Sequence, residues 1–264
     1  MTAQRKLRVR LLSAAVVALA LIAAPFGVSS AMAAPPPPVA KYVSLGDSYA
    51  AGQGAGGYVD ACMNSTSGYP AQLGQVPRIN LLRTPSCSGA TIADVMSSQI
   101  GSVNRGTTMI TITAGGDDLN PAAVWAACVP DSTSETCQQA IGAATTRVGA
   151  VGPAMVNLIM TVKGRSPNAV VIVTGYPHLF GDYAASHNPT LTAINDGIDG
   201  LNAQLTGAAA ATGAVFAPVD FGDHAIYGAD TPWFGMDPAD PVSLFHPTAD
   251  GYAAYAQAVL AVRP

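Results

Sequence analysis

Charged side chains are scarce in this sequence: only 11% of its 264 residues are Asp, Glu, Lys or Arg. Disordered chains are richer in charge and poorer in apolar residues, so a chain that is 49% hydrophobic is typical of a compact folded domain. Basic residues are the scarcer kind, with twelve Lys and Arg against sixteen Asp and Glu. Because the balance is acidic, we expect neither nucleic acid nor an anionic membrane surface as the main partner.

The sequence also lacks the motifs of common metal and nucleotide sites. It contains no H-E-x-x-H, phosphate-binding or dinucleotide-binding motif. No two of its four cysteines stand at C-x-x-C spacing, which argues against a cysteine-based zinc site. We therefore expect no metal and no cofactor.

The N-terminal segment predicts export. Residues 1–10 are basic and contain no acidic residue, and an apolar run from Leu11 to about Ala24, too short to span a bilayer, follows them. Ala31-Met32-Ala33 then matches an Ala-x-Ala cleavage site. No stop-transfer flank follows the apolar run, and no cysteine lies near the cleavage site to carry a lipid. We expect residues 1–33 to be a signal peptide and the protein to be secreted without a stable membrane anchor.

The remainder of the chain is expected to form a proline-rich spacer and one domain. Residues 34–40 include four consecutive prolines, which cannot hydrogen-bond into a helix or a sheet. Residues 41–264 contain no second linker, repeat or low-complexity block, and their length suits a single domain. Loss of the signal peptide would remove four of the twelve basic residues and leave eight against sixteen acidic ones. We expect a monomer.

The four cysteines would lie in an oxidising compartment, where structural disulfides form. Three pairings of four cysteines are possible. Sequential pairing, Cys62 with Cys87 and Cys128 with Cys137, closes two local loops, and we predict this pairing.

Short apolar runs alternate with helical stretches along the domain. Continuous apolar runs followed by turn residues predict buried parallel strands over Tyr42–Leu45, Met109–Thr113, Ala169–Thr174 and Val215–Val219. Helices are predicted over Thr91–Ser98, Gln138–Val162, Leu191–Ala211 and Thr248–Ala261. This alternation indicates an α/β fold with βαβ units and a mostly parallel sheet, in which the turns after the strands gather at one edge.

Three groups at this edge suit acyl transfer. Gly46-Asp47-Ser48 directly follows the first predicted strand, which would expose the hydroxyl of Ser48 as a nucleophile. His246, just before the last helix, is the candidate base. Gly89, ahead of another helix, permits close backbone approach, so its N–H is a candidate donor to an oxyanion. Each piece alone also fits a structural role: a polar turn, a surface histidine, and a helix start capped by Ser88.

Together these residues resemble the GDSL/SGNH family of esterases and lipases, in particular its secreted actinobacterial branch. The four sequence blocks of that family occur in order: Gly46-Asp47-Ser48, Cys87-Ser88-Gly89-Ala90-Thr91, Gly115-Gly116-Asp117-Asp118 and Ser243-Leu244-Phe245-His246-Pro247. The resemblance runs from about Tyr42 to the C-terminus. It implies a flavodoxin-like three-layer α/β/α sandwich, the SGNH hydrolase fold, with Ser48 as nucleophile, His246 as base, and the N–H groups of Ser48 and Gly89 as oxyanion donors.

The third block departs from the family, because Asp117 stands where the family has the asparagine of Gly-x-Asn-Asp. An ionised carboxylate only accepts hydrogen bonds and would repel an oxyanion. Loss of one oxyanion donor typically costs about 10²–10³ in rate. A protonated Asp117 could still donate, since burial and the neighbouring Asp118 raise its pKa. Asp117 could also turn away and leave two N–H donors, or it could cripple the site.

The last block departs as well, because Ser243 replaces the aspartate that the family usually has three residues before the histidine. We predict that the backbone carbonyl of Ser243 orients His246 in a Ser–His dyad. Asp237 and Asp240 are the competing candidates for a third catalytic residue. His224 is expected to make structural hydrogen bonds, His178 is expected at the rim of the cleft, and His187 is expected at the surface.

The sequence thus predicts a secreted carboxylic-ester hydrolase that acts on small-molecule or lipid esters through an acyl-enzyme. No long apolar lid is evident, which favours short- to medium-chain soluble esters; phospholipase and acetyl-carbohydrate esterase are alternatives within the class. The acyl group could occupy an aromatic pocket formed by Tyr49, Trp125, Trp233 and Phe234. The alternative function is a weak or inactive relative that binds acylated cell-wall glycans or lipids.

Overall fold

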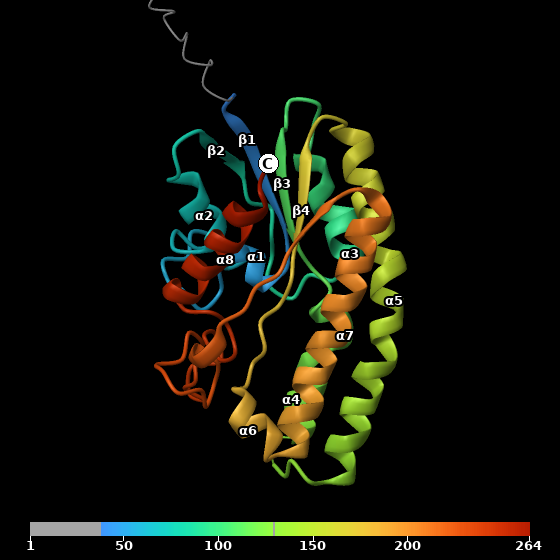
Figure 1. Cartoon of the computed structure of the whole chain (residues 1–264), viewed down its shortest axis with the longest axis vertical. Coiled ribbons are helices and arrows are strands. Elements are labelled where there is room, and N and C mark those ends of the chain that lie inside the picture. The colour runs from blue at the N-terminus through green and yellow to red at the C-terminus, as the bar shows by residue number, and fades with distance from the viewer. Residues whose placement is uncertain (1–37, 129) are drawn as a thin grey trace, which may run out of the picture. The chain divides into compact units, whose positions relative to one another are not determined.

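The computed structural model describes residues 38–128 and 130–264, so the predicted signal peptide and most of the spacer lie outside the described residues. A single parallel sheet forms the centre, with strand order β2-β1-β3-β4-β5 (Figure 1). Its strands are β1 (Ala40–Gly46), β2 (Ile79–Arg83), β3 (Met109–Thr113), β4 (Val170–Thr174) and β5 (Val215–Ala217). This is the flavodoxin-like order, so the predicted fold class is confirmed.

Helices cover both faces of the sheet (Figure 1). They are α1 (Ser48–Ala51), α2 (Tyr69–Gly74), α3 (Ile92–Asp94), α4 (Pro121–Cys128), α5 (Glu135–Arg165), α6 (Asp182–Ser186), α7 (Pro189–Thr212) and α8 (Ala249–Val262). The three long helices lie within a few residues of their predicted bounds. The helix predicted over Thr91–Ser98 is instead the short α3, which continues as a wider π-helical turn over Val95–Gln99.

The two faces of the sheet bury different side chains. Val43, Ile110 and Ile112 pack against the α5–α7 side, in an apolar core. Tyr42 and Met109 point to the opposite side, where α2 and α8 contribute a tyrosine-rich core. Because successive strand residues face opposite ways, strands that are buried on both faces read as the continuous apolar runs of the sequence.

Both predicted disulfides are present. Cys62 and Cys87 are bonded with their Cα atoms 4.3 Å apart, and Cys128 and Cys137 with theirs 4.5 Å apart. The first bond joins the loop after α1 to the loop before α3. The second joins the end of α4 to the first turn of α5.

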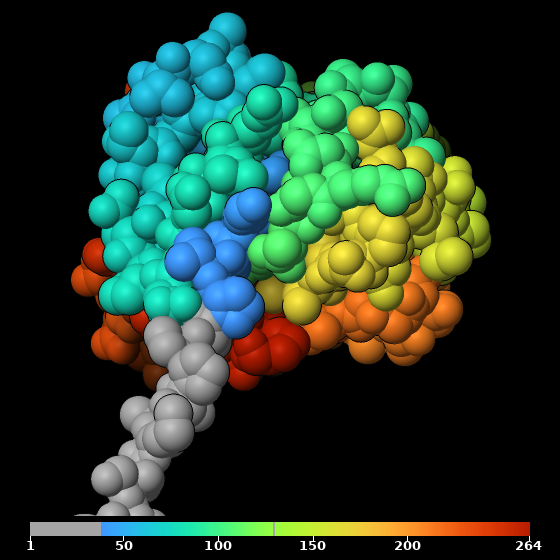
Figure 2. All heavy atoms as spheres, turned by 90° about the horizontal axis from the view of Figure 1, so that it is seen from above, coloured from blue at the N-terminus to red at the C-terminus, as the bar shows by residue number. Residues whose placement is uncertain are grey.

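The strands run in one direction, so their carboxyl ends share one edge, and α1, α4 and α6 lie toward that edge (Figure 1). Figure 2 looks onto the opposite end, where the start of β1 lies between neighbouring segments on either side, as expected of a strand inside the sheet. Within residues 38–128 and 130–264, no helix is long and apolar enough to cross a membrane.

Candidate active site

The turn that carries Ser48 depends on a glycine. Gly46 has φ +141°, and a Cβ there would lie 1.8 Å from the carbonyl oxygen of Thr113. The buried side-chain amide of Gln99 bonds both backbone groups of Gly46, each at 2.8 Å. The chain therefore leaves β1 in a tightly held turn and enters α1 at Ser48, whose N–H bonds to no described residue.

His246 meets Ser48 across 198 residues of sequence. Its Nε2 lies 3.0 Å from Oγ of Ser48, and its Nδ1 lies 2.9 Å from the carbonyl oxygen of Leu244. The prediction that Ser243 supplies this carbonyl is wrong, because the carbonyl of Ser243 accepts the backbone N–H of His246 at 2.9 Å. Phe245 has φ +59°, and this left-handed residue turns the loop so that the ring faces Leu244. Burial lowers the pKa of His246 to about 4.

Neither aspartate candidate for a third catalytic residue contacts the imidazole. Asp240 Oδ1 accepts the backbone N–H of Val242 at 3.1 Å and holds the loop ahead of the histidine. Asp237 Oδ1 accepts the N–H of Ala239 at 2.8 Å. Both carboxylates therefore shape the loop, and the group beside Nδ1 is a backbone carbonyl.

Sequence reasoning missed Gln53, whose buried side chain lies behind the histidine. Its Nε2 donates to the carbonyl of Val242 at 2.9 Å and lies 3.4 Å from Nδ1 of His246, and its Oε1 accepts from the hydroxyl of Ser88. Gln53 thus links the histidine loop to the loop that carries Gly89. A lone glutamine has no motif, and its partners lie 35 to 193 residues away, so no local pattern could have revealed it.

The loop at Gly89 is held beside the nucleophile turn. The N–H of Cys87 donates to the carbonyl of Gly46 at 3.1 Å, and the disulfide to Cys62 fixes the same point. Gly89 itself has φ +79°, and its N–H bonds to no described residue. Ser48 and Gly89 line the same cavity, and neither backbone N–H bonds to a described residue.

Asp117 lines this cavity too, from the turn after β3. Burial, followed by the charges of Asp118 and Asp94, raises its pKa to about 6. Asp118 points elsewhere and accepts the N–H of Ile92 at 3.0 Å, which ties the turn to α3. The side chain that replaces asparagine is therefore a carboxyl group that holds its proton into the mildly acidic range.

Asp47, which precedes the serine, is a buried structural carboxyl. Its Oδ1 accepts the N–H of Tyr49 at 2.9 Å and caps α1, and its Oδ2 accepts the hydroxyl of Tyr176. Burial, followed by the charge of Asp117, raises the pKa of Asp47 well above its usual range. The site thus gathers carboxyl groups without a lysine or arginine partner among the described residues.

The cavity has a volume of about 700 Å³ and extends from the catalytic residues between α4, α5 and α7. Tyr49 and Trp125 line it as predicted. Trp233 and Phe234 do not: Phe234 is buried in the core beside α8, and Trp233 stacks on His224 with ring centroids 3.8 Å apart. Sequence reasoning also missed α4, an apolar helix with no buried residue that forms one wall of the cavity.

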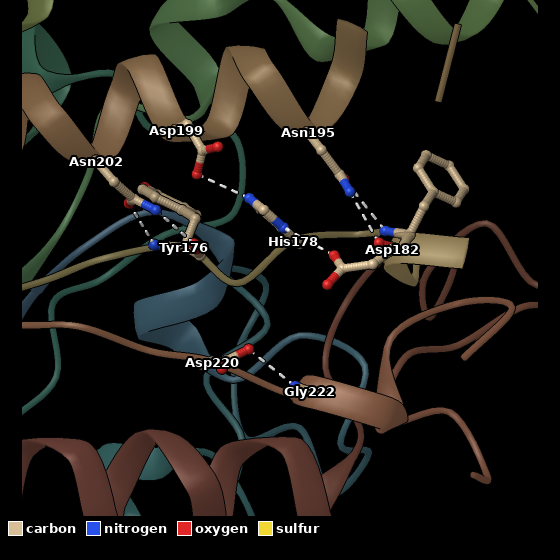
Figure 3. Close-up of polar contacts among 9 residues, drawn as sticks. Tyr176, His178, Asp182, Asn195, Asp199, Asn202, Asp220 and Gly222 are labelled. Carbon is tan, nitrogen blue, oxygen red and sulfur yellow. Dashed lines mark hydrogen bonds and ion pairs between the residues drawn. The ribbon is translucent and has the colours of Figure 1, made fainter. Parts of the chain in front are cut away.

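The other histidines lie apart from Ser48. Nε2 of His178 is 2.7 Å from the carboxylate of Asp199 on α7 (Figure 3). His224 makes the structural contact expected of it, with Nδ1 2.9 Å from a backbone carbonyl. His187 packs on Tyr183 at the surface. Within the part of the chain that the structure describes, the histidine that bonds Ser48 is His246.

Comparisons with known proteins identify relatives of this chain. Residues 44–254 match the GDSL-like lipase/acylhydrolase family. Lipase 1 of Streptomyces coelicolor is 34% identical over 88% of this chain and 90% of its own, and a lipase of Streptomyces rimosus is 33% identical over 92% and 95%. The crystal structure of an extracellular lipase from Streptomyces rimosus has a TM-score of 0.77 at 30% identity and covers 84% of this chain and 99% of its own. Phospholipase A1 of Streptomyces albidoflavus NA297 has the same TM-score and identity, over 85% and 99%.

Proposed function

The chain belongs to the GDSL-like lipase/acylhydrolase family and is a carboxylic-ester hydrolase, and we propose that it works through an acyl-enzyme on Ser48 with His246 as general base. The observation that carries this proposal is the 3.0 Å contact between Nε2 of His246 and Oγ of Ser48. A base within hydrogen-bond reach of the serine hydroxyl is what serine nucleophiles require.

In this mechanism Nδ1–H of His246 donates to the carbonyl of Leu244 and leaves the lone pair of Nε2 facing the serine. Oγ of Ser48 attacks the ester carbonyl while Nε2 takes its proton. The alcohol leaves with that proton, and a water molecule then attacks the acyl-enzyme with His246 again as base. Because burial lowers its pKa to about 4, the imidazole is neutral and ready to accept a proton at neutral pH.

We propose that the oxyanion is held by the N–H groups of Ser48 and Gly89 and by the protonated carboxyl of Asp117. A neutral carboxylic acid in an apolar site can donate to an oxyanion. With its pKa raised to about 6, Asp117 donates to the oxyanion in mildly acidic solution. At higher pH its ionised carboxylate repels the oxyanion. Catalysis then needs a pH at which His246 is neutral and Asp117 is protonated.

We propose further that the protein is exported and that residues 1–33 are removed. The basic and apolar N-terminal sequence supports this, as does the extracellular lipase of Streptomyces rimosus among the similar structures. The relatives include lipases and a phospholipase A1, which supports a lipid ester as the substrate.

Covalent labelling tests the nucleophile. A fluorophosphonate should label the wild-type protein and the Ser97→Ala control, whose exposed serine lies outside the site. Ser48→Ala should take no label and should lose at least about 10³-fold in hydrolysis of p-nitrophenyl acetate. Full hydrolysis by Ser48→Ala would refute the acyl-enzyme, and an unlabelled wild type would favour the binding protein without turnover.

A further inference from the structure

The cavity continues along α7 well beyond the catalytic residues. Four apolar or small residues, spaced three or four apart on one face of α7, line it: Leu191, Ile194, Gly197 and Leu201. Leu201 lies at the catalytic end, because it contacts the turn at Gly115 that leads to Asp117. The other end reaches Thr190, whose hydroxyl donates to the carbonyl of Ser132 at 2.8 Å.

The neighbouring face of α7 fixes the orientation of the helix about its own axis. Asn195 and Asn202 bond both backbone groups of residues in the loop after β4, and Asp199 bonds His178 between them (Figure 3). These three polar residues recur at the spacing of one helical face. With that face fixed to the loop, the adjacent face that contains Gly197 is turned into the cavity.

The part of the cavity that the neighbouring helix α5 lines is apolar as well. Ile141, Ala144 and Val148 of α5 line it, and Trp125 of α4 closes one side against Phe245 with ring centroids 4.6 Å apart. Among the described residues that line the cavity, the ionisable side chains that can carry charge at neutral pH lie at the catalytic end. Such a predominantly apolar channel favours hydrocarbon over a charged acid.

The length of the channel follows from helix geometry. Eleven residues separate Thr190 from Leu201, which corresponds to about 16 Å at 1.5 Å per residue. An extended chain advances about 1.2 Å per single bond, so the channel holds roughly a dozen carbon–carbon bonds. Gly197 lies four residues from Leu201, about 6 Å along the channel, or roughly five bonds.

We propose that this channel binds the acyl chain of the substrate, that it suits unbranched chains of about twelve carbons, and that Gly197 keeps it open. The proposal rests on the proposed function, because it takes the acyl carbonyl to lie beside Ser48. A Cβ added at Gly197 meets no atom within 4 Å, so a larger side chain there would enter the channel rather than clash with the fold.

Two glycines of α7 provide a matched test. Gly207 is exposed, lies outside the cavity, and also has free space around an added Cβ. We would measure kcat/KM on p-nitrophenyl esters from C2 to C16 at a fixed detergent concentration for the wild type, Gly197→Leu and Gly207→Leu. The wild type and Gly207→Leu should gain up to about fourfold per added CH₂ to about C12 and then level off. The kcat/KM of Gly197→Leu should match that of the wild type and Gly207→Leu on the C2 and C4 esters and should level off near C6.

The two proposals fail in different ways. A Gly197→Leu profile that parallels the Gly207→Leu profile at every length, with hydrolysis still dependent on Ser48, would overturn the channel and leave the acyl-enzyme in place. Hydrolysis of the C2 ester independent of Ser48 would overturn the proposed function itself. Ala144→Leu, at another residue that lines the cavity, should shorten the profile in the same way, and this second variant decides the test if Gly197→Leu does not fold.

Discussion

The imidazole of His246 contacts a hydroxyl, a carbonyl and an amide, and each contact has its own consequence. The hydroxyl of Ser48 lies against Nε2. The carbonyl of Leu244 accepts from Nδ1–H and so selects the tautomer in which Nδ1 carries the proton. A carbonyl stabilises the imidazolium less than a carboxylate would. The amide of Gln53 lies 3.4 Å from Nδ1 but makes no hydrogen bond to a protonated Nδ1, and it holds the histidine loop through the carbonyl of Val242 instead.

At the residue scale, Gln53→Ala should lower kcat about 5- to 10-fold on p-nitrophenyl acetate with little change in KM, which is the effect of losing a buried hydrogen bond of about 1 kcal/mol. Gln53→Glu has the same size but loses the donor to Val242 when ionised. Its kcat should therefore recover as the pH falls from about 7 to 5 and the buried carboxyl regains its proton.

Gln72→Ala is the matched control for Gln53. The side chain of Gln72 also donates to two backbone carbonyls, those of Ser67 and Ala249, at 2.8 and 3.0 Å, and neither belongs to the loop that Gln53 holds ahead of the histidine. This variant should keep the wild-type kcat. A Gln53→Glu variant whose activity does not depend on pH beyond the wild-type profile would contradict a positioning role.

At the element scale, the two disulfides serve different parts of the site. Cys62–Cys87 fixes the loop that presents Gly89, whereas Cys128–Cys137 joins α4 to α5 at the far end of the channel. Loop-closure entropy assigns about 3 kcal/mol of stability to each bond. A difference between them in catalysis would therefore reflect the element that each one holds.

We expect the double variant Cys62→Ala/Cys87→Ala to lose about 10-fold or more in kcat/KM on esters of every length, because an oxyanion donor is no longer fixed. The double variant Cys128→Ala/Cys137→Ala should keep the wild-type rate on acetate and lose activity on the C12 ester. We would compare the kcat/KM of each variant across ester chain lengths, measured below its melting temperature. Equal losses at every length in both variants would contradict this division.

Several elements could be predicted from the sequence because they are buried on both sides. β1, β3 and β4 read as continuous apolar runs for that reason, and the long helices carry one apolar face. β2 was missed because it lies at the sheet edge, and most of its residues are at least partly exposed. α4 was missed because it has no polar face, so its sequence shows no helical period.

Residue types at the site were predictable where a motif carries them, as for Ser48, Gly89 and His246. The carbonyl of Leu244 was not, because the choice between Leu244 and Ser243 depends on the positive φ of Phe245, which the sequence does not reveal. Gln53 was not, because its contacts join segments nearly the whole domain apart. Contacts of that kind follow from the tertiary fold alone.

At the scale of the whole molecule, the sheet order brings distant segments to one acid–base site. Ser48 follows the interior strand β1, Asp117 follows the neighbouring central strand β3, and His246 lies on a loop near the C-terminus. The site is acidic and buried, so the pKa values of its two titrating groups shift in opposite directions. Burial lowers the pKa of His246 to about 4 and raises that of Asp117 to about 6. In the proposed mechanism, catalysis is therefore restricted to the pH interval between these two pKa values.

The pH dependence of kcat/KM on p-nitrophenyl acetate, for the wild type and Asp117→Asn with Ser48→Ala as the blank, tests this account most directly. The base must be deprotonated and the donor protonated, so the wild-type rate should rise through a pH of about 4 and fall through about 6. Asp117→Asn should keep the rise, lose the fall, and exceed the wild type at pH 8 by about 10²-fold. A wild-type plateau that extends to pH 8, with no gain in Asp117→Asn, would contradict the account.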